Sequence, residues 1–175
     1  FLTLHANAQL WFDIGAKGGV GSGFSLNKTL SDDSRFSLNP GFNYFVGGKV
    51  GINWGHFIGV TFDVDYGKYS YSFNQAEVPG LNQSETYKFK MSYSAINLMP
   101  MVRYTKEEGY LELGPQFQLL RNPLIEDAAY PNSAPSGDTY ISNRLTGIVF
   151  GFGGHMVGNE IISLMAGLRF KYVIS

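Results

Sequence analysis

The sequence predicts an all-β protein, specifically a transmembrane antiparallel up-and-down β-barrel, and three observations predict this class. Seven segments alternate apolar and polar residues with the period of two that marks β-strands. Their connections alternate between short turns and long polar loops. Finally, 44% of the residues are hydrophobic and 15% aromatic, but only 15% are charged, whereas about 25% are charged in a typical soluble domain.

The first three segments run from Gln9 to about Gly21, from about Gly41 to Trp54 and from about Phe57 to Phe73. One face of each is mainly apolar, with Leu10, Phe12, Ile14 and Ala16 in the first, Phe42, Tyr44, Val46, Val50, Ile52 and Trp54 in the second, and Ile58, Val60, Phe62, Val64 and Tyr66 in the third. Since successive side chains of a strand point to opposite faces, the other face carries Gly and polar residues.

The remaining four segments run from about Thr86 to Tyr104, from about Tyr110 to Leu120, from about Tyr140 to Met156 and from about Glu160 to Ile174. Their apolar faces carry Ile96, Leu98, Pro100, Val102 and Tyr104, then Leu111, Leu113, Phe117 and Leu119, then Ile148, Phe150, Phe152 and Met156, and last Ile162, Leu164, Ala166, Leu168, Phe170 and Tyr172. We find no amphipathic helix, and no apolar run approaches the roughly 20 residues of a transmembrane helix.

The short connections lie at about Gly55–His56, Lys106–Gly109 and Val157–Asn159, and the long ones at about Ser22–Pro40, Asn74–Glu85 and Arg121–Thr139. Short turns therefore lie at one end of the sheet and long loops at the other, as in outer-membrane barrels. Residues that share a face must lie opposite each other across a tight hairpin. We therefore expect four cross-strand pairs: Trp54 with Ile58, Lys49 with Asp63, Tyr104 with Leu111, and Arg103 with Glu112.

A soluble lipocalin-like barrel would show the same alternation, but with its apolar face inward and a charged face in water. Here the polar face consists mostly of Gly, Ser, Thr, Asn and Gln. Glycine weakens a solvated strand face, yet it suits a narrow barrel interior that has little room for side chains. The apolar face ends in aromatic residues such as Trp54, Tyr66, Tyr104 and Tyr172, which are typical of the girdles that border a lipid-facing band.

Residues 1–8 read FLTLHANA. An apolar stretch that ends in Ala-x-Ala, here Ala6 and Ala8, is typical of the end of a secretory signal peptide. We therefore expect a signal-peptide remnant at residues 1–8 and a barrel domain at residues 9–175. The alternative is an ordinary first strand or tail.

Four stretches carry a family resemblance. INLMPMVRY (residues 96–104, with Pro100) is followed by GYLELGPQFQLL (residues 109–120, with Gly114 and Pro115). With the Gly-rich Ile14–Gly23 and with TGIVFGFGG at Thr146–Gly154, they resemble the PorT-like outer-membrane β-barrel family of Bacteroidota. The resemblance covers nearly the whole chain, and its motifs are structural. It implies eight strands, a location in the bacterial outer membrane and no shared catalytic site. Since members finish with an eighth strand that ends in an aromatic residue, we expect about seven strands here, the last one being absent.

Residues that could carry chemistry are few. The histidines are His5, His56 and His155, and the chain has no Cys, HExxH, GxSxG or Walker motif. Lipid-modifying barrel enzymes place catalytic groups at the long-loop rim, whereas His56 and His155 lie at the short turns. Asp32 and Asp33 could bind calcium, although solvated charge is the simpler interpretation. We expect no enzymatic activity, no metal and no cofactor.

An aromatic cluster flanks the second long loop and consists of Tyr69, Tyr71, Phe73, Tyr87, Phe89 and Tyr93. We interpret it as an interfacial girdle on strands that rise above the membrane. The alternative is a surface that contacts a ligand or a partner.

Charged residues on the polar face are the main site candidates: Asp13, Lys17, Lys49, Asp63, Asp65, Arg103, Glu112, Arg169 and Lys171. Because a buried charge needs a partner and both signs are present, they predict an interior ion-pair network. Such a network either fills the interior and fixes the strand register or lines a narrow gated pore.

These observations predict a small non-enzymatic outer-membrane barrel with a packed polar interior and a structural or accessory role through its extracellular loops. The alternatives are an accessory component of a protein-export machinery and a narrow, porin-like channel. The expected partners are outer-membrane lipid and a protein bound through the long loops or the barrel wall. The net charge of −1 gives no reason to expect nucleic acid.

Overall fold

The computed structural model describes residues 10–23, 36–55, 57–76, 86–127, 143–158 and 162–174. They form the strands β1 (Leu10–Gly23), β2 (Phe36–Asn39), β3 (Gly41–Trp54), β4 (Ile58–Ala76), β5 (Thr86–Lys106), β6 (Gly109–Asp127), β7 (Arg144–Gly158) and β8 (Ser163–Val173). Among the described residues, no helix is long and apolar enough to cross a membrane. The expected signal-peptide remnant at residues 1–8 lies outside the described residues.

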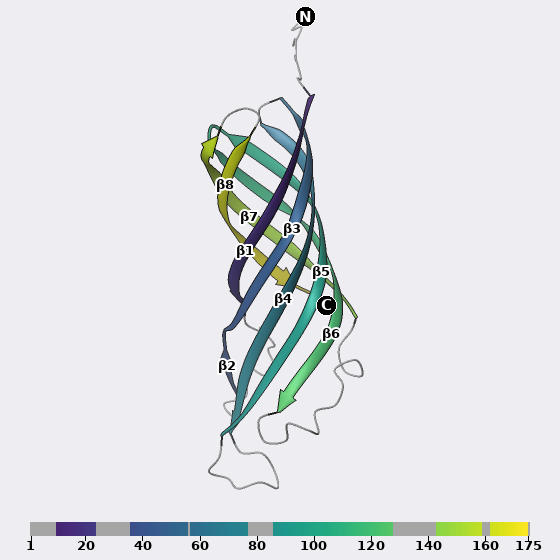
Figure 1. The fold of residues 1–175 in the computed structure, drawn as a ribbon, viewed down its shortest axis with the longest axis vertical. Helices are drawn as coiled ribbons and strands as arrows, with labels where there is room; N and C mark the ends of the chain where they lie inside the picture. Colours follow the sequence, from purple (N-terminus) through teal and green to yellow (C-terminus); the bar gives the residue numbers. More distant parts are fainter. Residues whose placement is uncertain are drawn as a thin grey trace, which may run out of the picture.

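The seven long strands form one antiparallel up-and-down sheet in the order β1-β3-β4-β5-β6-β7-β8. Figure 1 shows this sheet curling into a half-barrel. Neighbouring strands in this order are joined by hydrogen bonds. No ladder joins the edge strands β1 and β8 within the described residues. The predicted all-β, up-and-down class and the predicted seven long strands are therefore confirmed.

One short strand was not predicted. The first long connection contains β2, whose four residues pair with the far end of β4. Pro40 separates β2 from β3, and proline lacks the N–H that a continuous ladder needs. Four residues are too few for an alternation pattern to reveal a strand.

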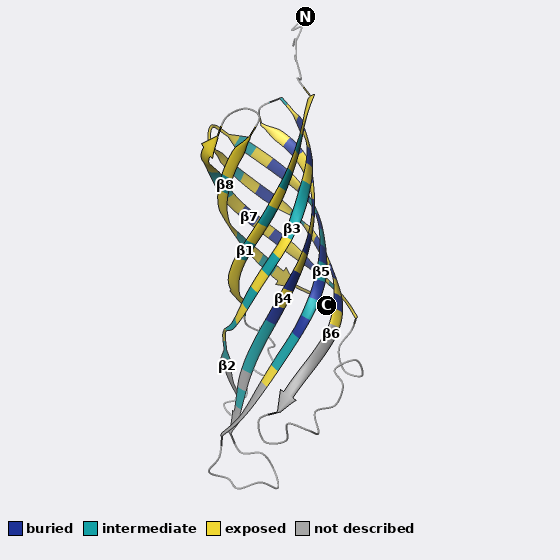
Figure 2. Cartoon of the chain, in the orientation of Figure 1, coloured by how far each residue is buried: buried dark blue, intermediate teal, exposed yellow. Residues whose placement is uncertain are grey.

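The predicted register is confirmed at all four cross-strand pairs: Trp54 lies opposite Ile58, Lys49 opposite Asp63, Tyr104 opposite Leu111, and Arg103 opposite Glu112. Figure 2 shows the consequence as alternating buried and exposed residues along the strands. The apolar residues form an exposed outer wall, for example Val60 at 43% and Ile14 at 86% exposure. The opposite face, which lines the interior, holds buried polar residues, including Asp63 at 0% exposure.

Strands β4 and β6 extend further toward the long loops than the alternation predicted, whereas β5 begins at Thr86 as predicted. On β4 the polarity of the two faces inverts near Tyr66 and Lys68. Beyond this point the outward residues of β4 are Ser70, Ser72 and Asn74, while the interior holds a buried cluster of Tyr69, Tyr93, Ala95 and Leu120. An apolar-out face suits lipid and an apolar-in face suits water, so the inversion marks the edge of the lipid-facing band.

Two interior glycines make room for polar neighbours. A Cβ atom at Gly51 would lie 2.6 Å from Asp13 Oδ1, and one at Gly59 would lie 2.1 Å from Asn53 Oδ1. Neighbouring polar side chains therefore occupy the space that larger residues would fill at these positions. At other interior glycines, such as Gly114 and Gly147, the nearest atom would be a backbone oxygen of the adjacent strand.

Two adjacent glycines of β3 provide a test of this packing. At Gly47, which faces the interior, a Cβ atom would lie 2.1 Å from the Val64 carbonyl oxygen, whereas at Gly48, which faces outward, it would lie 3.5 Å from the Gly15 oxygen. We expect Gly47→Ala to lower the free energy of unfolding by about 1–3 kcal/mol, because it overpacks rigid backbone. Gly48→Ala is the matched control and should be nearly neutral. Urea unfolding in detergent would measure both, and equal effects would contradict this interior packing.

Candidate functional site

The interior charges of the half-barrel form one continuous network. It comprises Asp13 and Lys17 from β1, Asp63 and Asp65 from β4, Arg103 from β5, Glu112 from β6, and Arg169 and Lys171 from β8. We call these residues the interior network. The strand alternation places each of them on the interior face, and the curl of the sheet brings them together.

Glu112 lies at the centre of the half of the interior network that is nearest the short turns. One of its carboxylate oxygens accepts hydrogen bonds from Arg103, whose Nε lies 2.9 Å away, and the other accepts from Arg169 Nη2 at 2.7 Å. Arg103 also reaches Asp13, with Nη1 3.4 Å from Oδ2. Since Arg103 and Glu112 are 5% and 1% exposed, this part of the network is almost completely shielded.

Asp63 connects the two halves of the network. Its Oδ2 atom accepts from Arg169 Nη1 at 2.8 Å and from Lys17 Nζ at 2.6 Å. Arg169 and Lys17 belong to the two edge strands of the sheet, β8 and β1, which share no backbone ladder in the described residues. A single carboxylate on β4 therefore ties both edges to the middle of the sheet.

Asp65 and two amides continue the network toward the long loops. Asp65 Oδ2 lies 3.3 Å from Lys17 Nζ and 3.4 Å from Lys171 Nζ. Its other oxygen accepts from Asn97 Nδ2, which also donates to the Tyr69 hydroxyl at 2.7 Å. Asn97 Oδ1 in turn accepts from Gln116 Nε2 at 2.9 Å. The network thus passes from charged to neutral partners as the interior approaches the long loops.

Lys49 is the one predicted candidate for the ion-pair network that does not belong to the interior network. Lys49 lies opposite Asp63 in the ladder, but among the described residues its ammonium makes no ion pair, and it lies 3.8 Å from the Met165 sulfur of β8. Asp63 is engaged instead by Lys17 and Arg169. Adjacent strands determine which residues are opposite, but long interior side chains can reach across the curled sheet to other partners.

The aromatic cluster is also corrected. Tyr69 and Tyr93 are buried on the interior face, with ring centroids 5.4 Å apart, and Tyr71 stacks on Tyr93 at 6.0 Å. The Tyr71 and Tyr93 hydroxyls are 3.2 Å apart. These three residues form a core above the lipid-facing band, not an outward girdle. The side chains of Phe73, Tyr87 and Phe89 lie outside the described part.

The predicted site residues did not include five buried polar residues that line the same interior: Asn53, Thr61, Asn97, Gln116 and Gln118. Their positions on the polar face of alternating strands could have identified them. Asn53 donates to Asp13 Oδ2 at 3.0 Å, so it belongs beside the interior network. His155 is exposed at the short-turn end of β7. His5, His56, Asp32 and Asp33 lie outside the described residues.

An up-and-down antiparallel sheet with an apolar outer wall and a charged interior defines the class of transmembrane β-barrel proteins. The family model described as outer membrane protein beta-barrel domain matches residues 7–123. The chain belongs to this family, and its location is the bacterial outer membrane. No curated protein and no solved structure matches the chain.

Proposed function

We propose that this protein is a non-enzymatic outer-membrane barrel whose interior is closed by its own side chains, and that it acts through its long loops and its outer wall. The continuous interior network is the observation that carries this proposal. It runs from Asp13 through Arg103, Glu112, Arg169 and Asp63 to Lys17 and Asp65 without a break.

The dimensions of a narrow barrel support a closed interior. An eight-stranded barrel is just wide enough for side chains to fill it. An ion crossing this interior would have to separate paired charges, and that separation is costly where the charges are shielded from water. The network is therefore better suited to fixing the register of the strands than to guiding ions.

The same contacts support a non-enzymatic role. Each carboxylate of the interior network is engaged by at least one Lys or Arg. A general acid or base must instead reach the proton that it transfers on a substrate. We also propose that the chain is PorT-like within its family, because its strands carry the motif with Pro100, Gly114 and Pro115.

Conductance in planar bilayers tests the proposal. We expect the purified protein to insert without producing discrete conductance steps. Arg169→Ala removes a side chain that contacts both Glu112 and Asp63, so it should produce measurable steps, whereas Val60→Ala on the outer wall should remain silent. Steps in the unmodified protein would overturn the proposal in favour of a narrow channel. Stoichiometric co-purification with a secretion complex would favour the export-accessory alternative.

A further inference from the structure

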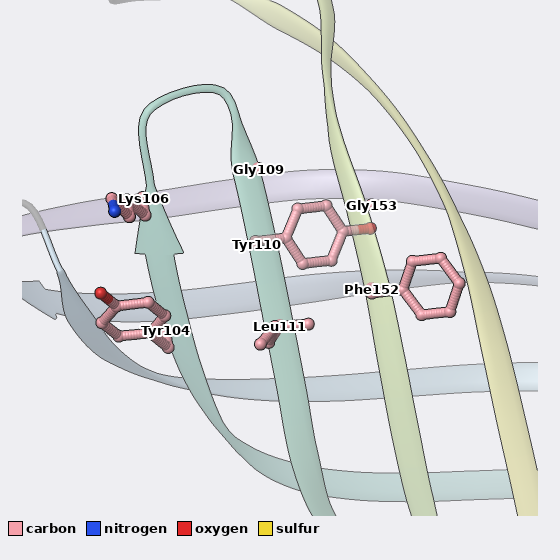
Figure 3. Close-up of a pocket in the computed structure, with 7 residues that line it drawn as sticks. All are labelled: Tyr104, Lys106, Gly109, Tyr110, Leu111, Phe152 and Gly153. Carbon is pink, nitrogen blue, oxygen red and sulfur yellow. The ribbon is translucent and has the colours of Figure 1, made fainter.

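The outer wall has a hollow at the short-turn end of β5, β6 and β7 (Figure 3). Its volume is about 310 Å³, and its lining includes Tyr104, Lys106, Gly109, Leu111, Phe152 and Gly153. This volume is at the lower end of the range of roughly 300–1,000 Å³ found for small-molecule sites. We call this hollow the wall groove.

The register explains why the wall is hollowed here. Tyr104, Leu111 and Phe152 lie opposite one another on three adjacent strands and form an outward row of large side chains. The next outward row, toward the turn, consists of Lys106, Gly109 and Gly154. Because the two glycines have no side chain, the surface is lower beside the row of large side chains. Lys106 lies at one end of this lower strip.

The wall groove lies at the level where the lipid-facing band of the outer wall meets the headgroup region. Tyr104 belongs to the last outward row of large apolar side chains before the turn, and amphipathic aromatic rings are enriched at the membrane interface. Beyond it lie the exposed Lys106 and the turn residues Glu107 and Glu108. In the described part of the chain Lys106 makes no ion pair, so its charge is free to bind a ligand.

The charge of the turn limits the kind of lipid. One lysine and two glutamates give Lys106–Glu108 a net charge of −1. The turn as a whole therefore repels an anionic lipid, but it offers charges of both signs to a zwitterionic headgroup. A primary ammonium can also donate hydrogen bonds to carboxylates, which a quaternary ammonium cannot do.

We propose that the wall groove binds a phospholipid with a zwitterionic headgroup that carries a primary amine. One acyl chain lies along the lower strip against Tyr104, Leu111 and Phe152. The phosphate lies at Lys106, and the ammonium lies at the carboxylates of Glu107 and Glu108.

Native mass spectrometry tests this proposal with an equimolar mixture of phosphatidylethanolamine, phosphatidylglycerol and phosphatidylcholine that have identical acyl chains. We expect phosphatidylethanolamine to be the main lipid retained by the protein. Lys106→Gln should weaken its binding about fivefold, the scale of one lysine at a lipid surface. Glu107→Gln with Glu108→Gln should remove the preference for phosphatidylethanolamine over phosphatidylcholine.

Two leucine substitutions separate the wall groove from the rest of the outer wall. A Cβ atom at Gly109 would have no neighbour nearer than 3.7 Å, so Gly109→Leu fills the groove without straining the backbone. It should reduce lipid retention about tenfold, since it occupies the space of the acyl chain. Gly48→Leu is the control, because Gly48 lies on β3, on a part of the outer wall outside the groove. Its Cβ atom would lie 3.5 Å from the nearest atom, the Gly15 oxygen, so this substitution also fits without a clash. Equal retention of the three lipids, or equal retention by the two leucine variants, would overturn the proposal.

Discussion

Glu112→Leu is expected to lower the free energy of unfolding by about 3–5 kcal/mol, the cost of removing one partner from a buried ion pair. Glu112 is 1% exposed and accepts hydrogen bonds from both Arg103 and Arg169. Its removal leaves Arg103 with Asp13 at 3.4 Å as its remaining ion-pair partner among the described residues. Most of the expected loss arises because the Arg103 guanidinium stays buried with only this weaker ion pair.

A double-mutant cycle in urea distinguishes lost pairing from lost packing. Arg103→Met alone should cost less than Glu112→Leu, because Glu112 keeps Arg169 as a partner. The double variant should cost clearly less than the sum of the two single variants, since it leaves no newly unpaired charge at this pair. Additive effects would show that the charges of this pair are not shielded and that water stabilises each of them separately.

The faces and the register could be predicted because both depend on local geometry. A period of two determines which residues share a face, and a tight turn determines which residues lie opposite each other. Gly55, with a φ of 63°, and Glu107, with a φ of 53°, have the left-handed conformations that such turns use. Lys49 thus lies opposite Asp63, and Arg103 opposite Glu112, as the sequence indicated.

The partners across the interior could not be predicted in this way. Lys17, Arg169 and Lys171 reach β4 from the two edges of the sheet, and their contacts depend on its curl. The positions at which β4 and β6 end near the long loops could not be predicted either, for a different reason. Beyond Lys68 the outward face becomes polar and the interior apolar, so the apolar-out pattern that identifies a lipid-facing strand no longer applies.

Val60→Arg should lower the free energy of unfolding by up to about 2–4 kcal/mol, since an arginine on the lipid face of a barrel costs this much at the bilayer midplane and less toward the interfaces. Val60 is 43% exposed on the outer wall, between Ile52 and Val102 of the adjacent strands. It lies within the outward apolar run of β4 from Ile58 to Tyr66, which we assign to the lipid-facing band. Leu164→Arg, on the outer wall at the start of β8, provides a second test of the same face.

Ser70→Arg is the matched control, because Ser70 faces outward on the same strand but lies beyond the polarity inversion. An arginine there remains in or near the headgroup region, where its cost falls to about 0–1 kcal/mol. Urea unfolding in lipid vesicles measures all three variants under one condition. If Val60→Arg and Ser70→Arg cost the same, the apolar run of β4 is not the lipid-facing band. A protein that stayed soluble and monomeric without detergent would contradict the same assignment, because its exposed outer wall would then face water.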